Sequence, residues 1–201
     1  PGIRLDRAEI VQAKAAGVPI ISTTKLFLAE AKGFVIGVTG TKGKGTTSQL
    51  LYNIISSARD TVFLGGNIGQ SPLKFLPQLN DQSITILELS SFQLADVTKS
   101  PHLAIVLMVT SEHLDYHKDL DEYIEAKAGI TKFQTADDTV IYNSDYPASV
   151  RIADQSKGNR LSVAVGATLE SPDVLHCFIH DGIIIVRLNG TEESIMPVSE
   201  I

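Results

Sequence analysis

Apolar and polar positions follow two different periods along most of the chain. Short runs rich in β-branched and aromatic residues, typical of buried strands, alternate with longer stretches in which apolar residues recur every three or four positions, typical of amphipathic helices. The runs predict strands over residues 34–39, 61–64, 84–89, 103–109, 139–142 and 160–165. The stretches between them predict helices over residues 44–58, 70–79, 92–98, 119–134 and 147–155. This alternation indicates an α/β fold, a mostly parallel sheet with helices on both faces.

The two ends of the chain depart from this pattern. Residues 1–32 hold helical stretches at 7–16 and 24–31 around a short apolar strand at 18–21, which is too little to form a core. We expect residues 1–32 to be the tail of a preceding domain or a linker, and residues 33–201 to form one domain. After about residue 167, two apolar runs flank the turn sequence His180-Asp181-Gly182, which predicts a small antiparallel hairpin near the C-terminus.

The composition narrows the class of protein. Hydrophobic residues make up 43% of the chain and charged residues 20%, which suits a globular protein with a real core. A net charge of −6 argues against nucleic-acid binding, and Cys177, the single cysteine, cannot form an internal disulfide. No apolar run approaches the ~18 residues of a membrane span, and no signal segment opens the chain. We therefore expect a cytoplasmic protein with no membrane partner and no nucleic-acid partner. We also expect a monomer that acts on small molecules, although these observations do not themselves fix either property.

A glycine-rich turn follows the first regular strand and precedes a helix. Its sequence is Gly40-Thr41-Lys42-Gly43-Lys44-Gly45-Thr46. Glycines let backbone N–H groups approach an anion, a helix N-terminus adds partial positive charge, and a lysine can reach terminal phosphates. The spacing is shorter than in the common P-loop, and Gly45 stands where Ser or Thr would follow Lys44. A turn that binds nothing, or a dinucleotide-binding turn, is the alternative, but a phosphate site is favoured.

Polar residues follow the second and third predicted strands. Glu88 interrupts an apolar strand, where a carboxylate is costly unless it is paired or bound to a metal, so a Mg²⁺ ligand is favoured over a solvated edge carboxylate. Ser90, Ser91 and Gln93 come next and would line the mouth of the site, although such residues also cap helices. Asn67 lies in the glycine-rich loop 65–69, which either approaches a ligand or is a flexible turn.

Two further candidates lie after the fourth predicted strand. The spacing of His113 and His117 could suggest zinc, but no third soft ligand is near, so His113 is better read as a ligand of a hard cation, a phosphate contact or a surface residue. Lys127 shares a helix face with the apolar residues Tyr123 and Ile124. A lysine in that place either extends its ammonium group to solvent or has a specific role.

Five segments in this order resemble motifs of the Mur ligases, the ATP-dependent amide ligases of peptidoglycan synthesis. They are the loop 40–46, similar to G-[ST]-x-G-K-[ST]-T; the loop 66–69; Glu88, in the place of the metal-binding glutamate; residues 110–113, similar to [TN]-x-[DE]-H; and Ala126-Lys127, in the place of the modified lysine. The run 88–94 is particularly similar to the members that add D-glutamate. Residues 1–3 resemble the segment that closes the first, UDP-binding domain of those members.

The resemblance implies a central ATP-binding domain that uses ATP and Mg²⁺ to join D-glutamate to UDP-N-acetylmuramoyl-L-alanine through an acyl phosphate. It assigns the β- and γ-phosphates to Lys44 and the loop 40–46, and the cations to Glu88, a loop hydroxyl (Thr46), His113 and a carbamylated Lys127. It assigns contacts with the muramoyl substrate or the mouth of the site to Asn67, Ser90, Ser91, Gln93 and His113.

The chain also departs from the family pattern. Gly45 removes the usual loop hydroxyl, with Thr46 the nearest substitute, and Lys42 replaces a common asparagine. The family's third domain, which binds the incoming amino acid, has no counterpart here, so we expect the chain alone to be inactive. Another ligase of the superfamily, such as a folylpolyglutamate synthase, and a non-catalytic nucleotide-binding module are the alternatives.

Overall fold

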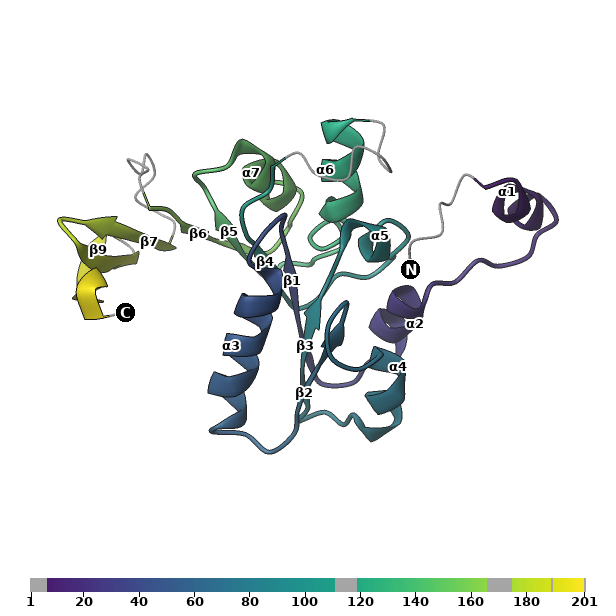
Figure 1. Cartoon of the computed structure of the whole chain (residues 1–201), viewed down its shortest axis with the longest axis horizontal. Helices are drawn as coiled ribbons and strands as arrows, with labels where there is room; N and C mark the ends of the chain where they lie inside the picture. The colour runs from purple at the N-terminus through teal and green to yellow at the C-terminus, as the bar shows by residue number, and fades with distance from the viewer. Residues whose placement is uncertain (1–6, 111–118, 166–174, 189, 201) are drawn as a thin grey trace.

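The computed structural model describes residues 7–110, 119–165, 175–188 and 190–200. These residues form one sheet of nine strands in the order β2-β3-β1-β4-β5-β6-β7-β8-β9 (Figure 1). The strands are β1 (Phe34–Thr39), β2 (Val62–Gly66), β3 (Ile84–Glu88), β4 (Leu103–Val106), β5 (Thr139–Asn143), β6 (Asn159–Val163), β7 (Leu175–His180), β8 (Ile183–Leu188) and β9 (Thr191–Pro197). Every neighbouring pair from β2 to β7 is parallel, whereas β7, β8 and β9 are antiparallel. The α/β prediction and the C-terminal hairpin are therefore confirmed.

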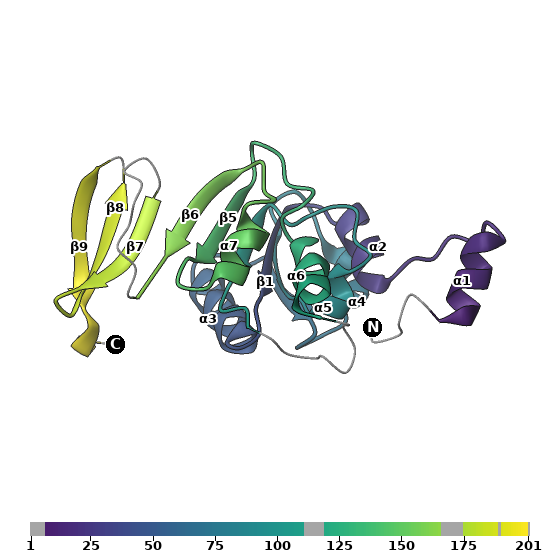
Figure 2. The same cartoon turned by 90° about the horizontal axis from the view of Figure 1, so that it is seen from above.

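Helices cover both faces of the parallel part, but unequally. Helix α3 packs on one face against β1, β2 and β3, while the other described helices that touch the sheet lie on the opposite face (Figures 1 and 2). The helices are α1 (Ala8–Ala15), α2 (Thr23–Glu30), α3 (Lys44–Ser56), α4 (Pro72–Phe75), α5 (Ser91–Leu94), α6 (Leu120–Ala128) and α7 (Pro147–Ala153), with 3₁₀ turns at Leu76–Gln78 and Val198–Glu200.

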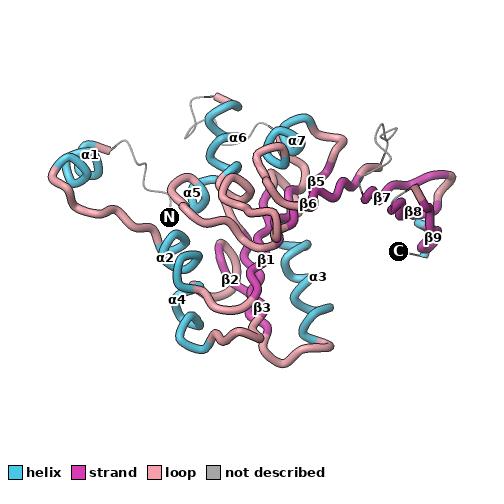
Figure 3. Tube along the Cα trace, turned by 180° about the vertical axis from the view of Figure 1, so that it is seen from behind, coloured by secondary structure: helices cyan, strands magenta, loops and turns pink. Residues whose placement is uncertain are grey.

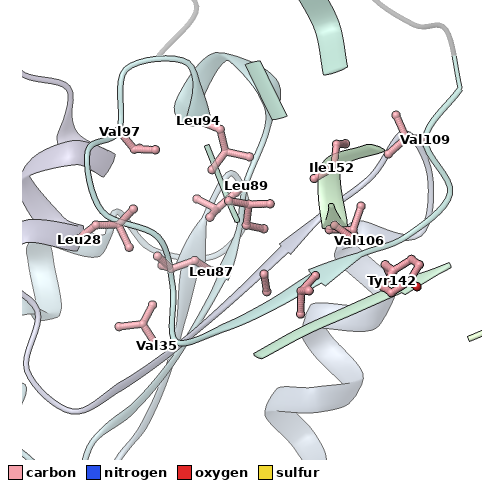
Figure 4. Close-up of a cluster of buried hydrophobic side chains, with 14 of the residues drawn as sticks. Leu28, Val35, Leu87, Leu89, Leu94, Val97, Val106, Val109, Tyr142 and Ile152 are labelled. Atoms are coloured by element: carbon pink, nitrogen blue, oxygen red, sulfur yellow. The ribbon is translucent and has the colours of Figure 1, made fainter. Parts of the chain in front are cut away.

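Two groups of buried side chains hold these layers together. The larger group joins the sheet to α2, α4, α5, α6 and α7 and includes Leu28, Leu87, Leu94 and Ile152 (Figure 4). The smaller group lies beneath α3, where Ile36, Val38, Ile86 and Ile105 meet apolar side chains of the helix. Because alternate residues of a strand face opposite sides, Glu88 lies on the α3 face with Ile86. This face is therefore where the glutamate can meet the start of α3.

The predicted strand at 18–21 is wrong. The structure has no strand there, and the segment runs as an extended link from α1 to α2 (Figure 3). Val18 and Ile21 are more than half exposed, and Pro19 has no N–H to give to a neighbouring strand. Helix α1 buries none of its residues, whereas α2 buries Phe27 and Leu28 in the larger core group.

Several predicted elements are shorter than expected. The helix predicted over 119–134 ends at Ala128. Gly129 follows it and lies so close to the backbone of Leu94 that a Cβ atom would be 2.4 Å from its carbonyl oxygen, so the chain needs a glycine there. Phe133, which lies near the end of the predicted range, is exposed. The helix predicted over 70–79 breaks into α4 and a 3₁₀ turn that contains Pro77, and the helix over 92–98 is the short α5. Strand β4 ends at Val106, and β9 was not predicted.

Candidate active site

The site lies at the carboxyl ends of β1, β3 and β4. From β1 the chain crosses to β2 at the edge of the sheet and returns through β3, and only then continues on the other side of β1 with β4. In open α/β sheets, ligands bind where the order of strands reverses in this way. The loop 40–46 leaves β1 at that point, and Glu88 ends β3 beside it, paired with Val38 of β1 and Gly66 of β2.

The loop's backbone takes a conformation that its glycines permit. Gly43 caps α3 with φ +85°, and Gly40 has φ +153° and lies so close to β4 that a Cβ atom would be 2.8 Å from Leu107 Cβ. Both φ values are rare for other residues. The 13-residue helix α3 begins at Lys44 and directs its first N–H groups into the loop. These features form a cradle for an anion.

Thr41 fixes the loop to the segment that leaves β4. Its N–H donates to Met108 O at 2.7 Å, and its hydroxyl donates to Thr110 O at 2.9 Å while accepting from Thr110 N at 3.0 Å. The same hydroxyl lies 3.4 Å from the hydroxyl of Tyr123 on α6. The loop is therefore held in place before any ligand arrives.

Two lysines converge on the carbonyl oxygen of Gly40. Lys44 Nζ donates to it at 2.9 Å and to Thr41 O at 3.0 Å. Lys127 Nζ donates to it at 3.1 Å and to Thr39 Oγ1 at 3.3 Å. The side chain of Lys127 is only 1% exposed, and its ammonium group lies 4.6 Å from the centre of the Tyr123 ring. The burial of Lys127 thus excludes extension of its ammonium group to solvent, while a specific role for this lysine stays a prediction.

Glu88 lies at the bottom of the site, 4% exposed. Asn67 is bonded to it twice, through its backbone N–H to Glu88 O at 2.9 Å and through Nδ2 to Oε1 at 3.2 Å. The second carboxylate oxygen, Oε2, faces α3, where a Cβ atom on Gly45 would be 3.5 Å from it. The structure therefore brings the predicted residues Asn67, Glu88 and Gly45 together.

Ser90, Ser91 and Gln93 follow Glu88 at the start of α5. Ser90 and Gln93 form a capping box: Ser90 Oγ accepts from Gln93 N at 3.3 Å, and Gln93 Oε1 accepts from Ser90 N at 3.0 Å. Ser91 and Gln93 are buried. Capping, the plainer interpretation of these residues, is thus seen directly, while contact with a substrate stays a prediction.

The carboxylate of Glu88 suits a hard cation such as Mg²⁺. Carboxylate and hydroxyl oxygens are its preferred ligands. Ser48, three residues after Gly45 on α3, is fully buried, and its hydroxyl has no hydrogen-bond partner among the described residues. Thr46, the predicted loop hydroxyl, is exposed. The described residues contain no group of three or more His, Cys, Asp or Glu side chains placed to hold a metal. His113 and His117 lie outside the described residues.

Sequence reasoning missed the supporting roles of Thr39 and Tyr123, and it did not predict that Ser48 is buried. Thr39 bonds Lys127 and donates to Leu89 O at 2.9 Å, so it orients the lysine. Tyr123 was assigned only to the apolar stripe, although its spacing of four residues from Lys127 on one helix was a signal that the two side chains meet. Ser48 gave no signal, because a serine within a helix is usually on the surface.

Fold and site together define a P-loop nucleotide-binding α/β domain. Residues 38–191 match the family model "Mur ligase middle domain". The chain belongs to the Mur ligase family, and the resemblance found in its motifs is confirmed. None of the described helices combines the length and the hydropathy needed to cross a membrane.

Two curated relatives match the whole chain. The UDP-N-acetylmuramoylalanine--D-glutamate ligases of Acetivibrio thermocellus and Acidobacterium capsulatum are 36% and 34% identical to it. The chain covers 42% and 43% of their lengths, so it spans less than half of each. Among solved structures, MurF ligase from Thermotoga maritima in complex with ADP is 25% identical with a TM-score of 0.58, over 86% of this chain and 42% of that one.

Proposed function

We propose that this chain is the ATP-binding part of an ATP-dependent ligase that adds D-glutamate to UDP-N-acetylmuramoyl-L-alanine. The observation that carries the proposal is the convergence of Lys44 and Lys127 on the glycine-rich loop directly beside Glu88. The ammonium group of Lys44 and a row of N–H groups suit a polyphosphate, and a buried carboxylate next to them suits its cation. The names of the curated relatives support the choice of substrates, and the ADP complex of the neighbouring MurF supports the nucleotide.

In the proposed reaction, an oxygen of the substrate carboxylate attacks the γ-phosphorus of ATP, and the bond to the β,γ-bridging oxygen breaks to release ADP. The amine of D-glutamate then attacks the carbonyl carbon of the acyl phosphate, loses a proton and displaces phosphate as the amide forms. Such chemistry depends on positioning and on charge neutralisation. Lys44 and the N–H groups of the loop 40–46 would hold the β- and γ-phosphates, and Asn67 and the residues that begin α5 would face the muramoyl substrate.

Glu88, His113, Lys127 and the loop hydroxyl assigned to Thr46 would hold divalent cations. When bound, the cations would neutralise the charge of the phosphate oxygens. As an ammonium, Lys127 is a donor to Thr39 and Gly40, so it would have to be carbamylated to become a ligand. The protein's own task is to keep this lysine, Glu88 and the loop in fixed positions.

The test is ADP and phosphate release by the full-length protein with a panel of UDP-muramoyl substrates and amino acids. We expect activity only with UDP-N-acetylmuramoyl-L-alanine and D-glutamate, and at least a hundredfold loss in Lys44→Met. Lys157→Met, a change of an exposed lysine outside the site, is the matched control and should retain activity.

Activity with folate substrates, or ATP binding without turnover in any combination, would refute the proposal. We also propose that the 201-residue chain alone does not turn over ATP, because its relatives are more than twice as long. D-Glutamate-dependent phosphate release by that chain would contradict this point.

A further inference from the structure

We propose that, in the full-length protein, an amphipathic helical segment that follows residue 201 packs on the α3 side of strands β4–β8. This inference goes beyond the proposed function, because it concerns a surface outside the nucleotide site. Three observations carry it: an apolar surface that continues sideways from the core beneath α3, the absence of a helix over it among the described residues, and the place where the described chain ends.

The first observation is that the apolar group beneath α3 continues across the next strands. Val38, which lies beneath α3, pairs with Ile105 of β4, and Ile105 pairs with Ile141 of β5. Ile141 pairs in turn with Leu161 of β6. Because directly paired residues point to the same side of a sheet, these side chains form one apolar row on the α3 side.

The apolar surface continues into the antiparallel strands. Val163 of β6 pairs with Cys177 of β7, and Cys177 pairs with Val186 of β8. The opposite side of the same two strands carries the polar residues His180 and Arg187, since side chains alternate along a strand. We call the apolar side chains of β5–β8 on the α3 side the open strip; they are Ile141, Leu161, Val163, Cys177, Ile179, Ile184 and Val186.

The second observation is that the open strip lacks a cover. On the opposite side of the sheet Val140 is fully buried beneath α7, whereas on the α3 side Ile141 and Leu161 are only partly buried and Val163 is 36% exposed. Helix α3 packs against β1, β2 and β3, and the other described helices that touch the sheet lie on the opposite face (Figures 1 and 2). Parallel sheets occur with both faces covered, so one face of this sheet is covered over half of its width.

The dimensions of the surface suit helices. Neighbouring strands lie about 4.8 Å apart, so the five strands from β4 to β8 span about 19 Å. Packed helices lie about 8–10 Å apart, so one or two helices beside α3 would fill this width. The open strip is a face of the sheet, whose backbone groups are already paired between strands. Its partner must therefore offer apolar side chains, which an amphipathic helix does along one stripe.

The third observation is the position of the turn Val198–Glu200. It lies on the same side of the molecule as α3, and β6 and β7 lie between the two in both views (Figures 1 and 2). The N–H of Val198 donates to Gly182 O at 2.8 Å, which fixes this turn to the β7–β8 turn. Because the chain covers less than half of its curated relatives, a longer protein has residues to place here. A segment that continues from this turn reaches the open strip without crossing the sheet.

The first test is photo-cross-linking in the full-length protein. Val163→p-benzoylphenylalanine places a photoreactive ketone on the open strip, and digestion followed by mass spectrometry identifies the residues to which it bonds. We expect cross-links within one chain to residues that follow 201. Ile183→p-benzoylphenylalanine is the matched control, because Ile183 is 37% exposed but lies on the opposite side of β8, and it should not give these cross-links.

The second test introduces a charge on the open strip of the full-length protein. Val163→Asp should lower the urea midpoint by about 1 M, because a carboxylate beneath a helix loses its hydration without a partner. Ile183→Asp should lower the midpoint by less than half as much. Val163→Thr, which keeps the shape of valine and adds a hydroxyl, gives the same comparison with Ile183→Thr if the aspartate variant does not fold.

Three results would overturn the inference. Cross-links from residue 163 to residues that precede 34 would give the open strip to the preceding part of the chain, and cross-links to a second copy would give it to a dimer. No cross-link, together with equal midpoint shifts at 163 and 183, would show that water covers it. Neither test uses a nucleotide, so the proposed function is decided separately.

Discussion

Gly66, the last residue of β2, is the position where one added carbon atom should do the most damage to the site. A Cβ atom there would be 2.2 Å from Glu88 O and 2.9 Å from Glu88 N, both backbone atoms of β3. Its φ of +105° also disfavours any residue except glycine. We therefore expect Gly66→Ala to separate β2 from β3 at the point where Glu88 is held.

The magnitude can be worked from these contacts. The φ value alone costs about 1–2 kcal/mol. To relieve the overlap, Glu88 O must move about 0.8 Å, from 2.2 Å to the 3.0 Å below which Cβ contacts are essentially never seen. Such a shift breaks the bond from Asn67 N and strains the adjoining bonds of the ladder, each worth about 0.5–1.5 kcal/mol. Together these terms predict a loss of about 3–5 kcal/mol in the free energy of unfolding.

Gly182 in the β7–β8 turn provides the control. Its φ is +74°, and a Cβ atom would have no neighbour within 4 Å, so Gly182→Ala should cost only the backbone term of about 1 kcal/mol. Because the chain contains no tryptophan, urea unfolding is best followed by far-ultraviolet circular dichroism. The claim is that the close approach of β2 to Glu88 allows only glycine at residue 66. It would be refuted if Gly66→Ala lost no more stability than Gly182→Ala at equal m-values.

Three other predictions concern groups that are wholly or partly buried. Val35 N–H donates to Nδ1 of His102 at 3.0 Å, and burial lowers the pKa of this histidine. The contribution of neutral His102 to the free energy of unfolding should therefore be fully present above about pH 6.5 and should fall as the pH decreases below it. Urea midpoints from pH 5 to 8 should show this slope in the wild type and a flatter one in His102→Asn. Lys127→Met should keep the free energy of unfolding within about 2 kcal/mol of the wild-type value, because Thr39 and the carbonyl of Gly40 each keep another hydrogen bond. The same change should lower phosphate release at least a hundredfold. A loss of stability large enough to account for the loss of activity would contradict this prediction. Burial raises the pKa of the Cys177 thiol, so it should react with a disulfide reagent at pH 8 more slowly in the native protein than in urea, and equal rates would count against it.

The fold was predictable where hydrophobic pattern and sheet position agree. The run at 34–39 is strand β1 with the same bounds, because a strand between two parallel neighbours is apolar throughout and gives a strong signal. The run at 18–21 is just as apolar but has no neighbouring strand, which no local pattern reveals. Strand β9 (Thr191–Pro197) is the reverse case. Its first four residues are polar and do not predict a strand, but the segment is a strand because it pairs with the edge of β8.

The site was predictable as a set of residue types but not as a set of contacts. The inward position of Lys127 followed from helical spacing, since α6 must bury the face that carries Tyr123 and Ile124. That its ammonium group bonds Thr39 and Gly40 depends on how α6 lies over the end of β1, which is a tertiary property. Ser90 and Gln93 show the reverse case, in which a local rule, the capping box, explains the contacts that the structure shows between them.

The carbonyl oxygen of Gly40, which accepts from both Lys44 and Lys127, has a consequence for the energetics of nucleotide binding. In the free protein this oxygen acts as a stand-in for a phosphate oxygen, so the ammonium group of Lys44 already has a partner when the anion arrives. Binding is then an exchange of acceptors at Lys44 rather than the making of a new bond, and the enthalpy gained there is correspondingly small. Affinity at this loop should come mainly from positive charge that is in place in advance, without ordering of the Lys44 side chain.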